Sequence, residues 1–264
     1  MGADKKRNHK KRSRNPKVEK VLISQPNNEG TLIRRDGRLY ENELLYREGR
    51  HKPTLRGCLH LLCVLLLPYV VWRLTQQGRG SLYTMFVALL FSTTNVLLFV
   101  CSAIFHVGIW SHETEIMMQK LDHMACSLFA AGKMIPLAML AFPKYPGMLL
   151  LCMLTVTCIW NFWNTINCKP SVIRQAMIPA CLMPFIYPYC IDHMTFFEFY
   201  AMVLILVCQG IGALIFTYEY PNPFPNHFGY HEIFHIFVAI AGGLSIVASG
   251  SIIERSAAAF TGAN

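Results

Sequence analysis

The chain has 264 residues, of which 53% are hydrophobic and only 15% are charged. This composition excludes an ordinary soluble globular domain and predicts an all-α membrane protein. The formal net charge of +9 is unevenly spread, because 16 of the 24 Lys and Arg residues come before residue 57.

The first element in chain order is a basic N-terminal tail, residues 1–52. It opens MGADKKRNHK and contains no apolar run that could serve as the core of a signal peptide. We expect this tail to be disordered and cytosolic, and to contact anionic lipid head groups or to fix the topology of the membrane domain. A basic arm can also bind nucleic acid, but in front of a membrane domain we expect no such partner.

Seven apolar runs of about spanning length follow the tail, since a helix needs ~20 residues to cross a bilayer. Polar or proline-rich segments separate the runs, and one of these is SHETE at 111–115. Residues 53–254 are therefore predicted to form a seven-transmembrane helix bundle, and 255–264 a short C-terminal tail. The seven runs are Leu55–Thr75, Leu82–Ile109, Met124–Phe142, Met148–Ile166, Val172–Ile191, Phe196–Phe216 and Ile233–Ile253.

The distribution of positive charge predicts the orientation of the bundle. With the N-terminus in the cytosol, the cytosolic segments hold the 16 basic residues of the tail region together with Lys120, Lys169 and Arg174. The opposite side then holds four, which are Arg73, Arg79, Lys144 and Arg255. By the positive-inside rule we expect a cytosolic N-terminus and a C-terminus that is lumenal or extracellular, in a membrane that the sequence does not specify.

A few polar residues interrupt the apolar runs, and such residues mark candidate functional sites. Ser102 and His106 lie four apart at the end of the second run, Asp122 lies in what we expect to be the first turn of the third, and His231 and His235 begin the seventh. In the predicted topology all three helix ends face the cytosol. The sequence therefore predicts that these side chains meet in one layer.

Three imidazoles with an open fourth position are the ligand set of a catalytic zinc ion, so we expect one zinc at this layer. Asp122 would orient or deprotonate a water there, or hold a ligand imidazole. Ser102 would bond Asp122 or a developing oxyanion, or would bond back to the carbonyl four residues earlier.

Two further residues are open to more than one interpretation. His60, inside the first run, either lines the site or is a packed core histidine. Cys126 lies one turn beyond Asp122 on the same face, and it is either a ligand or a packed thiol. The ten cysteines contain no C-x-x-C pair and are interpreted as core residues rather than as a disulfide framework.

Three segments together carry a family resemblance: SAIFH, then LDHMACSLFAAGKMIP, then FGYHEIFHIF. They resemble the progestin and adipoQ receptor (PAQR) and hemolysin III family, which includes adiponectin receptor-like proteins, over roughly residues 45–254. The resemblance implies a seven-helix bundle with zinc held by His106, His231 and His235, and with Asp122 and Ser102 beside the metal water. It also implies hydrolysis of a lipid amide of the ceramide type, or a receptor coupled to that activity.

The chain departs from the family pattern at Lys133, where a small or hydroxyl residue is usual. Eleven residues are close to three helical turns, so Lys133 returns to the face of Asp122 about 16 Å deeper. Asn95 and Gly242 stand at the same offset from His106 and His231. These three residues either form the floor of a lipid-accommodating cavity or, in the alternative, Lys133 extends along lipid to the outer interface.

Four functions follow from these observations. The first is a zinc-dependent hydrolase of a lipid amide or ester, and the second is a receptor or scaffold with a structural zinc. The third is an intramembrane metalloprotease, because HEIFH at 231–235 satisfies the pattern H-E-x-x-H. We interpret Glu232 as incidental to this pattern, since it lies off the face that the two histidines share. The fourth is a lytic pore, which the name of the hemolysin III family suggests.

Overall fold

The computed structural model describes residues 53–167 and 171–262, and in the N-terminal region the strand residues 21–23, 31–33, 45–46 and 50–51. The chain divides into two compact units, residues 1–52 and 53–264. In the first unit, β1 (Val21–Ile23) pairs antiparallel with β2 (Thr31–Ile33), and β3 (Leu45–Tyr46) with β4 (Arg50–His51). The other residues of the N-terminal tail, which we expect to be disordered and cytosolic, lie outside the described residues.

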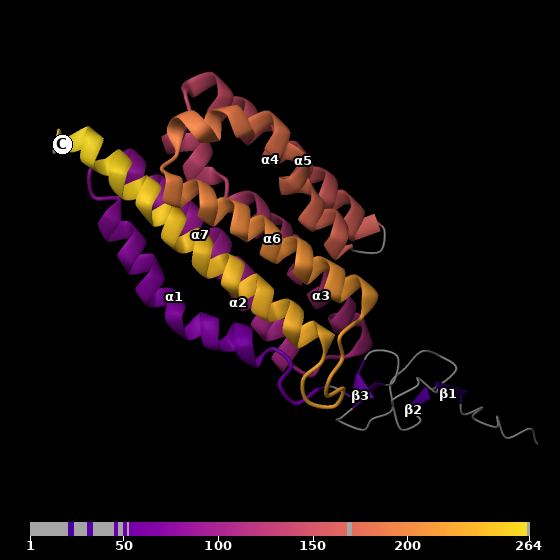
Figure 1. The fold of residues 1–264 in the computed structure, drawn as a ribbon. Helices are drawn as coiled ribbons and strands as arrows, with labels where there is room; N and C mark the ends of the chain where they lie inside the picture. Colours follow the sequence, from indigo (N-terminus) through magenta and orange to yellow (C-terminus); the bar gives the residue numbers. More distant parts are fainter. Residues whose placement is uncertain are drawn as a thin grey trace, which may run out of the picture. The chain divides into compact units, whose positions relative to one another are not determined.

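Long helices lying side by side build the described part of the second unit (Figure 1). A short π-helical segment, η1, follows α3 after four residues and precedes α4. The elements are α1 (Cys58–Gln77), α2 (Leu82–Val107), α3 (His112–Gly132), η1 (Leu137–Ala141), α4 (Lys144–Asn167), α5 (Val172–His193), α6 (Phe196–Tyr218) and α7 (Tyr230–Thr261).

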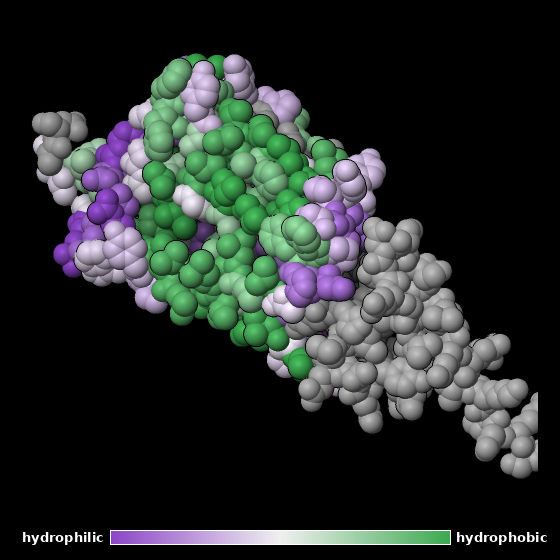
Figure 2. Space-filling view, turned by 60° about the horizontal axis from the view of Figure 1, so that its bottom comes forward, coloured by the Kyte–Doolittle hydropathy of each residue, from purple (hydrophilic) through white to green (hydrophobic). Residues whose placement is uncertain are grey.

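The outer surface of this unit is apolar over a broad area. Large side chains such as Leu65, Trp163 and Phe185 are exposed. Figure 2 shows the apolar surface as a wide green region with hydrophilic residues gathered toward its two ends. A surface of this kind is stable in lipid rather than in water.

Six helical segments in the described residues are long and apolar enough to cross a membrane. One of them, Glu113–Ala141, joins α3 to η1. The helix α5, which corresponds to the predicted run Val172–Ile191, is not among the six, so the count of seven spans is not confirmed. Of the predicted runs, α5 is the one interrupted by Arg174, Gln175 and three prolines.

The third helix begins well before the predicted run, so Asp122 lies in its third turn and not in its first as expected. The hydroxyl of Ser111 caps the helix by accepting a hydrogen bond from the backbone N–H of Thr114. Glu113 and Glu115 follow in the first turn, where acidic side chains complement the helix dipole. The polar segment SHETE is therefore a helix start and not only a separator.

The seventh helix continues to Thr261, through most of the residues predicted to form a C-terminal tail. An ion pair supports this extension: Arg255 Nη2 donates to Glu198 Oε2 on α6 at 2.9 Å. Ser251 Oγ donates to the other oxygen of the same carboxylate at 2.8 Å. The last turns of α7 are thus held against α6, which explains why no separate tail begins at 255.

The helices that carry the candidate site pack against one another. α7 packs against α6, α1 and α2, and α2 packs against α1 and α3. Next to the site, Leu67, Leu98, Phe99 and Phe129 form an apolar cluster from α1, α2 and α3. This packing fixes the rotation of each helix and hence the direction of its polar side chains.

Candidate metal centre

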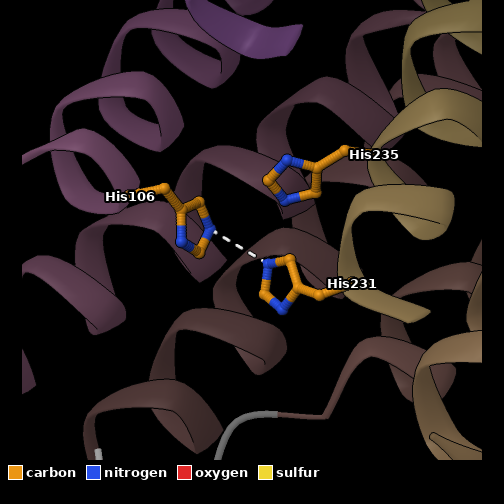
Figure 3. A group of neighbouring side chains, drawn as sticks. All are labelled: His106, His231 and His235. Atoms are coloured by element: carbon orange, nitrogen blue, oxygen red, sulfur yellow. Dashed lines mark hydrogen bonds between the residues drawn. The ribbon is translucent and has the colours of Figure 1, made fainter. Parts of the chain in front are cut away.

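Three buried histidines from two helices meet at one end of the bundle. His106 lies in the last turn of α2, and His231 and His235 lie in the first two turns of α7. One ring nitrogen from each lies within 4.8 Å of the others. Figure 3 shows the three rings converging from α2 on one side and α7 on the other. The layer that the sequence predicts therefore forms, and this group could hold a metal ion.

The spacing of one pair of nitrogens matches that of two ligands on a tetrahedral ion. His106 Nε2 and His231 Nε2 are 3.3 Å apart, and two nitrogens at ~2.0–2.1 Å from a tetrahedral zinc are themselves about 3.3 Å apart. The nitrogen of His235 lies within 4.8 Å of both. Imidazole nitrogens are also donors that zinc prefers. The three residues thus fit the expected metal by ligand type, and His106 and His231 fit it by distance as well.

A carboxylate lies beside the three imidazoles. Asp122 Oδ2, on α3, is 3.8 Å from His106 Nε2, and both side chains are buried. This distance places the carboxylate next to the position that an ion would occupy, close enough to bond a water there. The structure therefore brings Asp122 to the site from the third turn of its helix.

An apolar pocket begins next to the same site. It is lined by Phe234 and Val238, which flank His235 on α7, and by Cys126, which lies one turn from Asp122. The pocket opens at the surface, and its remaining lining residues are Leu98, Phe129, Ala130, Val172, Gln175, Cys208, Gln209 and Gly212. Such a lining favours an apolar group over a charged one.

A family model described as haemolysin-III related matches residues 48–244 of the chain. The chain belongs to this family. The matched range contains His106, Asp122, His231 and His235, so every side chain of the candidate centre lies inside it. The resemblance stated from the sequence is confirmed, and the haemolysin-III-related protein is a membrane protein with several apolar helices.

We expected Ser102 to bond Asp122 or a developing oxyanion, or to bond back to the carbonyl four residues earlier. Among the described residues, the hydrogen bond of Ser102 goes to a different side chain. Ser102 Oγ instead lies 2.8 Å from His60 Nδ1 on α1. His60 is buried, and its ring stacks on His235 with centroids 3.9 Å apart and an angle of 1° between the planes. The ambiguous histidine of the first span is thus in contact with a candidate ligand.

Sequence reasoning gave no site role to Arg56, which forms a buried ion pair with Glu232. Arg56 Nε donates to Glu232 Oε1, while Glu232 Oε2 accepts from the backbone N–H of Gly229 at 2.7 Å. Glu232 therefore caps α7 and joins it to the start of α1, which agrees with its predicted incidental place in HEIFH. The sequence signal that indicates this residue is a basic side chain at the start of an apolar run.

The three residues of the predicted second layer, Asn95, Lys133 and Gly242, are all buried in the bundle, and the cavity floor that they would form stays a prediction. Lys133 is buried, and its Nζ lies 4.0 Å from the centre of the Phe129 ring, so it does not extend along lipid. Asn95 is fully buried, and its Nδ2 donates to the carbonyl of Phe91 at 3.0 Å. Gly242 faces Phe99 and Phe129. Of the five predicted cavity-lining residues, Cys126 alone lines the pocket described above; the others are His60, Asn95, Lys133 and Gly242.

Proposed function

We propose that this haemolysin-III-related protein is a zinc-dependent hydrolase that cleaves the amide bond of a ceramide-like lipid. The observation that carries the proposal is the meeting of His106, His231 and His235 beside Asp122, next to an apolar pocket. Three neutral nitrogen ligands, a neighbouring carboxylate and an open position are the arrangement used for hydrolysis at zinc sites.

The protein's own groups divide the chemistry between them. When bound, zinc supplies Lewis-acid chemistry, which acidifies a water and stabilises negative charge on a carbonyl oxygen. Asp122 Oδ2 orients the attacking water, accepts its proton and returns that proton to the leaving nitrogen of the amide. The three histidines lie at the ends of α2 and α7, and both helices pack against neighbouring helices. The imidazoles therefore hold their positions as charge develops on the carbonyl oxygen.

The pocket supports a lipid substrate. Its lining is almost wholly apolar, and it starts at residues one turn from Asp122 and His235. The acyl chain of a lipid amide or ester can occupy this space while its carbonyl lies at the metal centre. Cys126 is part of the wall, which favours its interpretation as a packed thiol.

We also propose how the chain crosses the membrane. The apolar run of α5 completes seven spans, which place the two termini on opposite sides of the membrane. The excess of Lys and Arg before the first span then places the N-terminus in the cytosol and the C-terminus in the lumen or outside the cell. The metal centre then lies near the cytosolic surface. Residues 1–52, with their many Lys and Arg, contact anionic lipid head groups on that side.

One geometric observation argues against the protease that HEIFH suggests. In that mechanism the glutamate of the motif acts as the general base. Here both oxygens of Glu232 are engaged, one by Arg56 and one by the backbone of Gly229. The carboxylate that lies beside the imidazoles is Asp122.

The experiment that tests the proposal compares purified wild type with Asp122→Asn. Zinc content is measured by elemental analysis, and fatty-acid release is measured with a panel of ceramides and related amides and esters. We expect the wild type to hold one zinc and to release fatty acid, and the variant to keep zinc but to lose at least about 100-fold in rate, as for a missing general base. Zinc binding without turnover on any lipid would instead support a receptor or scaffold with a structural zinc.

A further inference from the structure

We infer that His60 and Ser102 form a positioning pair that sets the affinity and geometry of the metal centre. This inference rests on the proposed binding of a metal by His106, His231 and His235. It assigns Ser102 to the support of the ligands rather than to a contact with Asp122 or an oxyanion. His60 and Ser102 both lie within the membrane domain and are buried.

The first observation is the stack of His60 on His235. The two rings are parallel within 1°, and their centroids are 3.9 Å apart, so the rings are stacked in direct contact. On its other sides, His60 meets the ring of Phe99 edge to face, with centroids 5.2 Å apart. A flat, buried surface on one face of His235 restricts the rotation of its ring, so His60 fixes the direction of the ligand nitrogen.

The second observation is the hydrogen bond that holds His60 itself. Ser102 Oγ lies 2.8 Å from His60 Nδ1, and this bond fixes the rotation of the His60 ring about its Cβ–Cγ bond. Ser102 is one helical turn before His106 on α2. Through this bond the turn of α2 that carries one ligand is tied to the ring that supports a ligand on α7.

The pair therefore links the two helices that supply the ligands. α1, which carries His60, packs against both α2 and α7. Gly57 at the start of α1 is also close to α2, since a Cβ there would lie 2.8 Å from His106 Cβ. Residues that orient metal ligands typically change metal affinity by about 10–100-fold when they are replaced. Replacing a side chain that only fills space should leave the visible spectrum of a metal ion bound at the site unchanged.

The test uses four variants of the full-length protein. His60→Ala removes the stack and the hydrogen bond, while His60→Phe keeps a flat ring and loses the bond to Ser102. Ser102→Ala removes the same bond from the other side, and the double variant His60→Phe with Ser102→Ala completes a cycle. Zinc affinity is measured by competition with a chromophoric chelator, and the visible spectrum of the cobalt-loaded protein reports the geometry of the ligands. Ser92→Ala is the matched control, because Ser92 is a buried serine on the same helix ten residues away.

We expect His60→Ala to lower zinc affinity by about 10–100-fold and to shift the cobalt spectrum. His60→Phe and Ser102→Ala should each have a smaller effect, and the double variant should lose no more than the larger of the two. Ser92→Ala should match wild type in both measurements. Size-exclusion chromatography of each variant shows whether it is folded. His60→Phe, which keeps an aromatic ring at this position, keeps the test decisive if His60→Ala does not fold.

Three results would overturn the inference. One is a His60→Phe protein with the zinc affinity and cobalt spectrum of wild type. Another is strict additivity of His60→Phe and Ser102→Ala. The third is a Ser102→Ala protein that keeps its zinc affinity and loses turnover, which would make Ser102 a catalytic residue. A wild type that binds no zinc would overturn the proposed metal site as well, whereas zinc binding without lipid hydrolysis would leave the inference in place.

Discussion

His106 Nε2 and His231 Nε2 lie 3.3 Å apart although 125 residues separate them in the chain. With His235 they form a group whose ligand nitrogens are all within 4.8 Å. We expect His106→Ala or His231→Ala to lower zinc affinity at least about 100-fold, since loss of a ligand should cost no less than loss of a residue behind a ligand. Metal content after dialysis against a weak chelator is the measurement.

His193 provides the control for this prediction. It is the last residue of α5, and its ring lies next to Phe142 rather than in the histidine group. His193→Ala should therefore retain the metal. Loss of zinc from His193→Ala, or full zinc content in His231→Ala, would contradict the site as described.

Gly132 on α3 is a point of close approach to α2. A Cβ at this position would lie 2.1 Å from Thr94 Oγ1 and 2.6 Å from Thr94 Cβ. We expect Gly132→Ala to destabilise the bundle by roughly 1–3 kcal/mol, because the overlap forces α2 and α3 apart. The free energy of unfolding in mixed micelles, followed by circular dichroism, is the measurement.

Gly243→Ala is the matched control, because a Cβ there would meet nothing within 4 Å. This substitution should leave stability unchanged or raise it by up to about 1 kcal/mol, since Ala is the better helix former. Equal effects of the two substitutions would show that the contact between Gly132 and Thr94 is not close in the protein.

Lys133 is a buried cation that forms no hydrogen bond to the described residues, and its Nζ lies over the ring of Phe129. A cation–π contact contributes about 2 kcal/mol when desolvated, which is less than the cost of burying a charge. We expect Lys133→Met to raise the free energy of unfolding by about 1–3 kcal/mol, because Met keeps the volume and removes the charge.

Lys120→Met serves as the comparison. Lys120 is partly exposed, and its Nζ donates to the carbonyl of Ile166 at 3.0 Å. Its replacement should change stability by no more than about 1 kcal/mol. If Lys133→Met destabilises the protein more than Lys120→Met does, the charge of Lys133 has a partner. An anionic lipid that co-purifies with wild type but not with the variant would be that partner. That result would support the predicted cavity floor.

The buried pair of Arg56 and Glu232 joins the start of α1 to the first turn of α7. Arg56→Met leaves a buried carboxylate without its cation, and we expect a loss of about 3–5 kcal/mol in the free energy of unfolding. Adding Glu232→Gln removes the remaining charge and should recover part of this loss. A double variant less stable than Arg56→Met would contradict a role for the pair as charge compensation.

Local features of the sequence determined the membrane class and the histidines of the candidate metal centre. Apolar runs of spanning length are set by composition alone, and the i, i+4 spacing of His231 and His235 places both on one helix face whatever surrounds it. In the predicted seven-span topology, the alternation of spans places the end of α2 and the start of α7 on one side of the bundle. For these reasons the histidine group could be predicted.

Tertiary structure decided which neighbours these residues meet. The sequence alone allowed Ser102 to bond Asp122 or the backbone of its own helix. Because α1 packs against α2, the partner of Ser102 in the structure is His60. Likewise, Phe99 and Phe129 contact each other, and packing places Lys133 over the Phe129 ring and Gly242 next to both rings. The reason is physical: periodicity gives the face of a helix that a residue occupies, but the rotation and separation of packed helices depend on side-chain contacts between segments far apart in the chain.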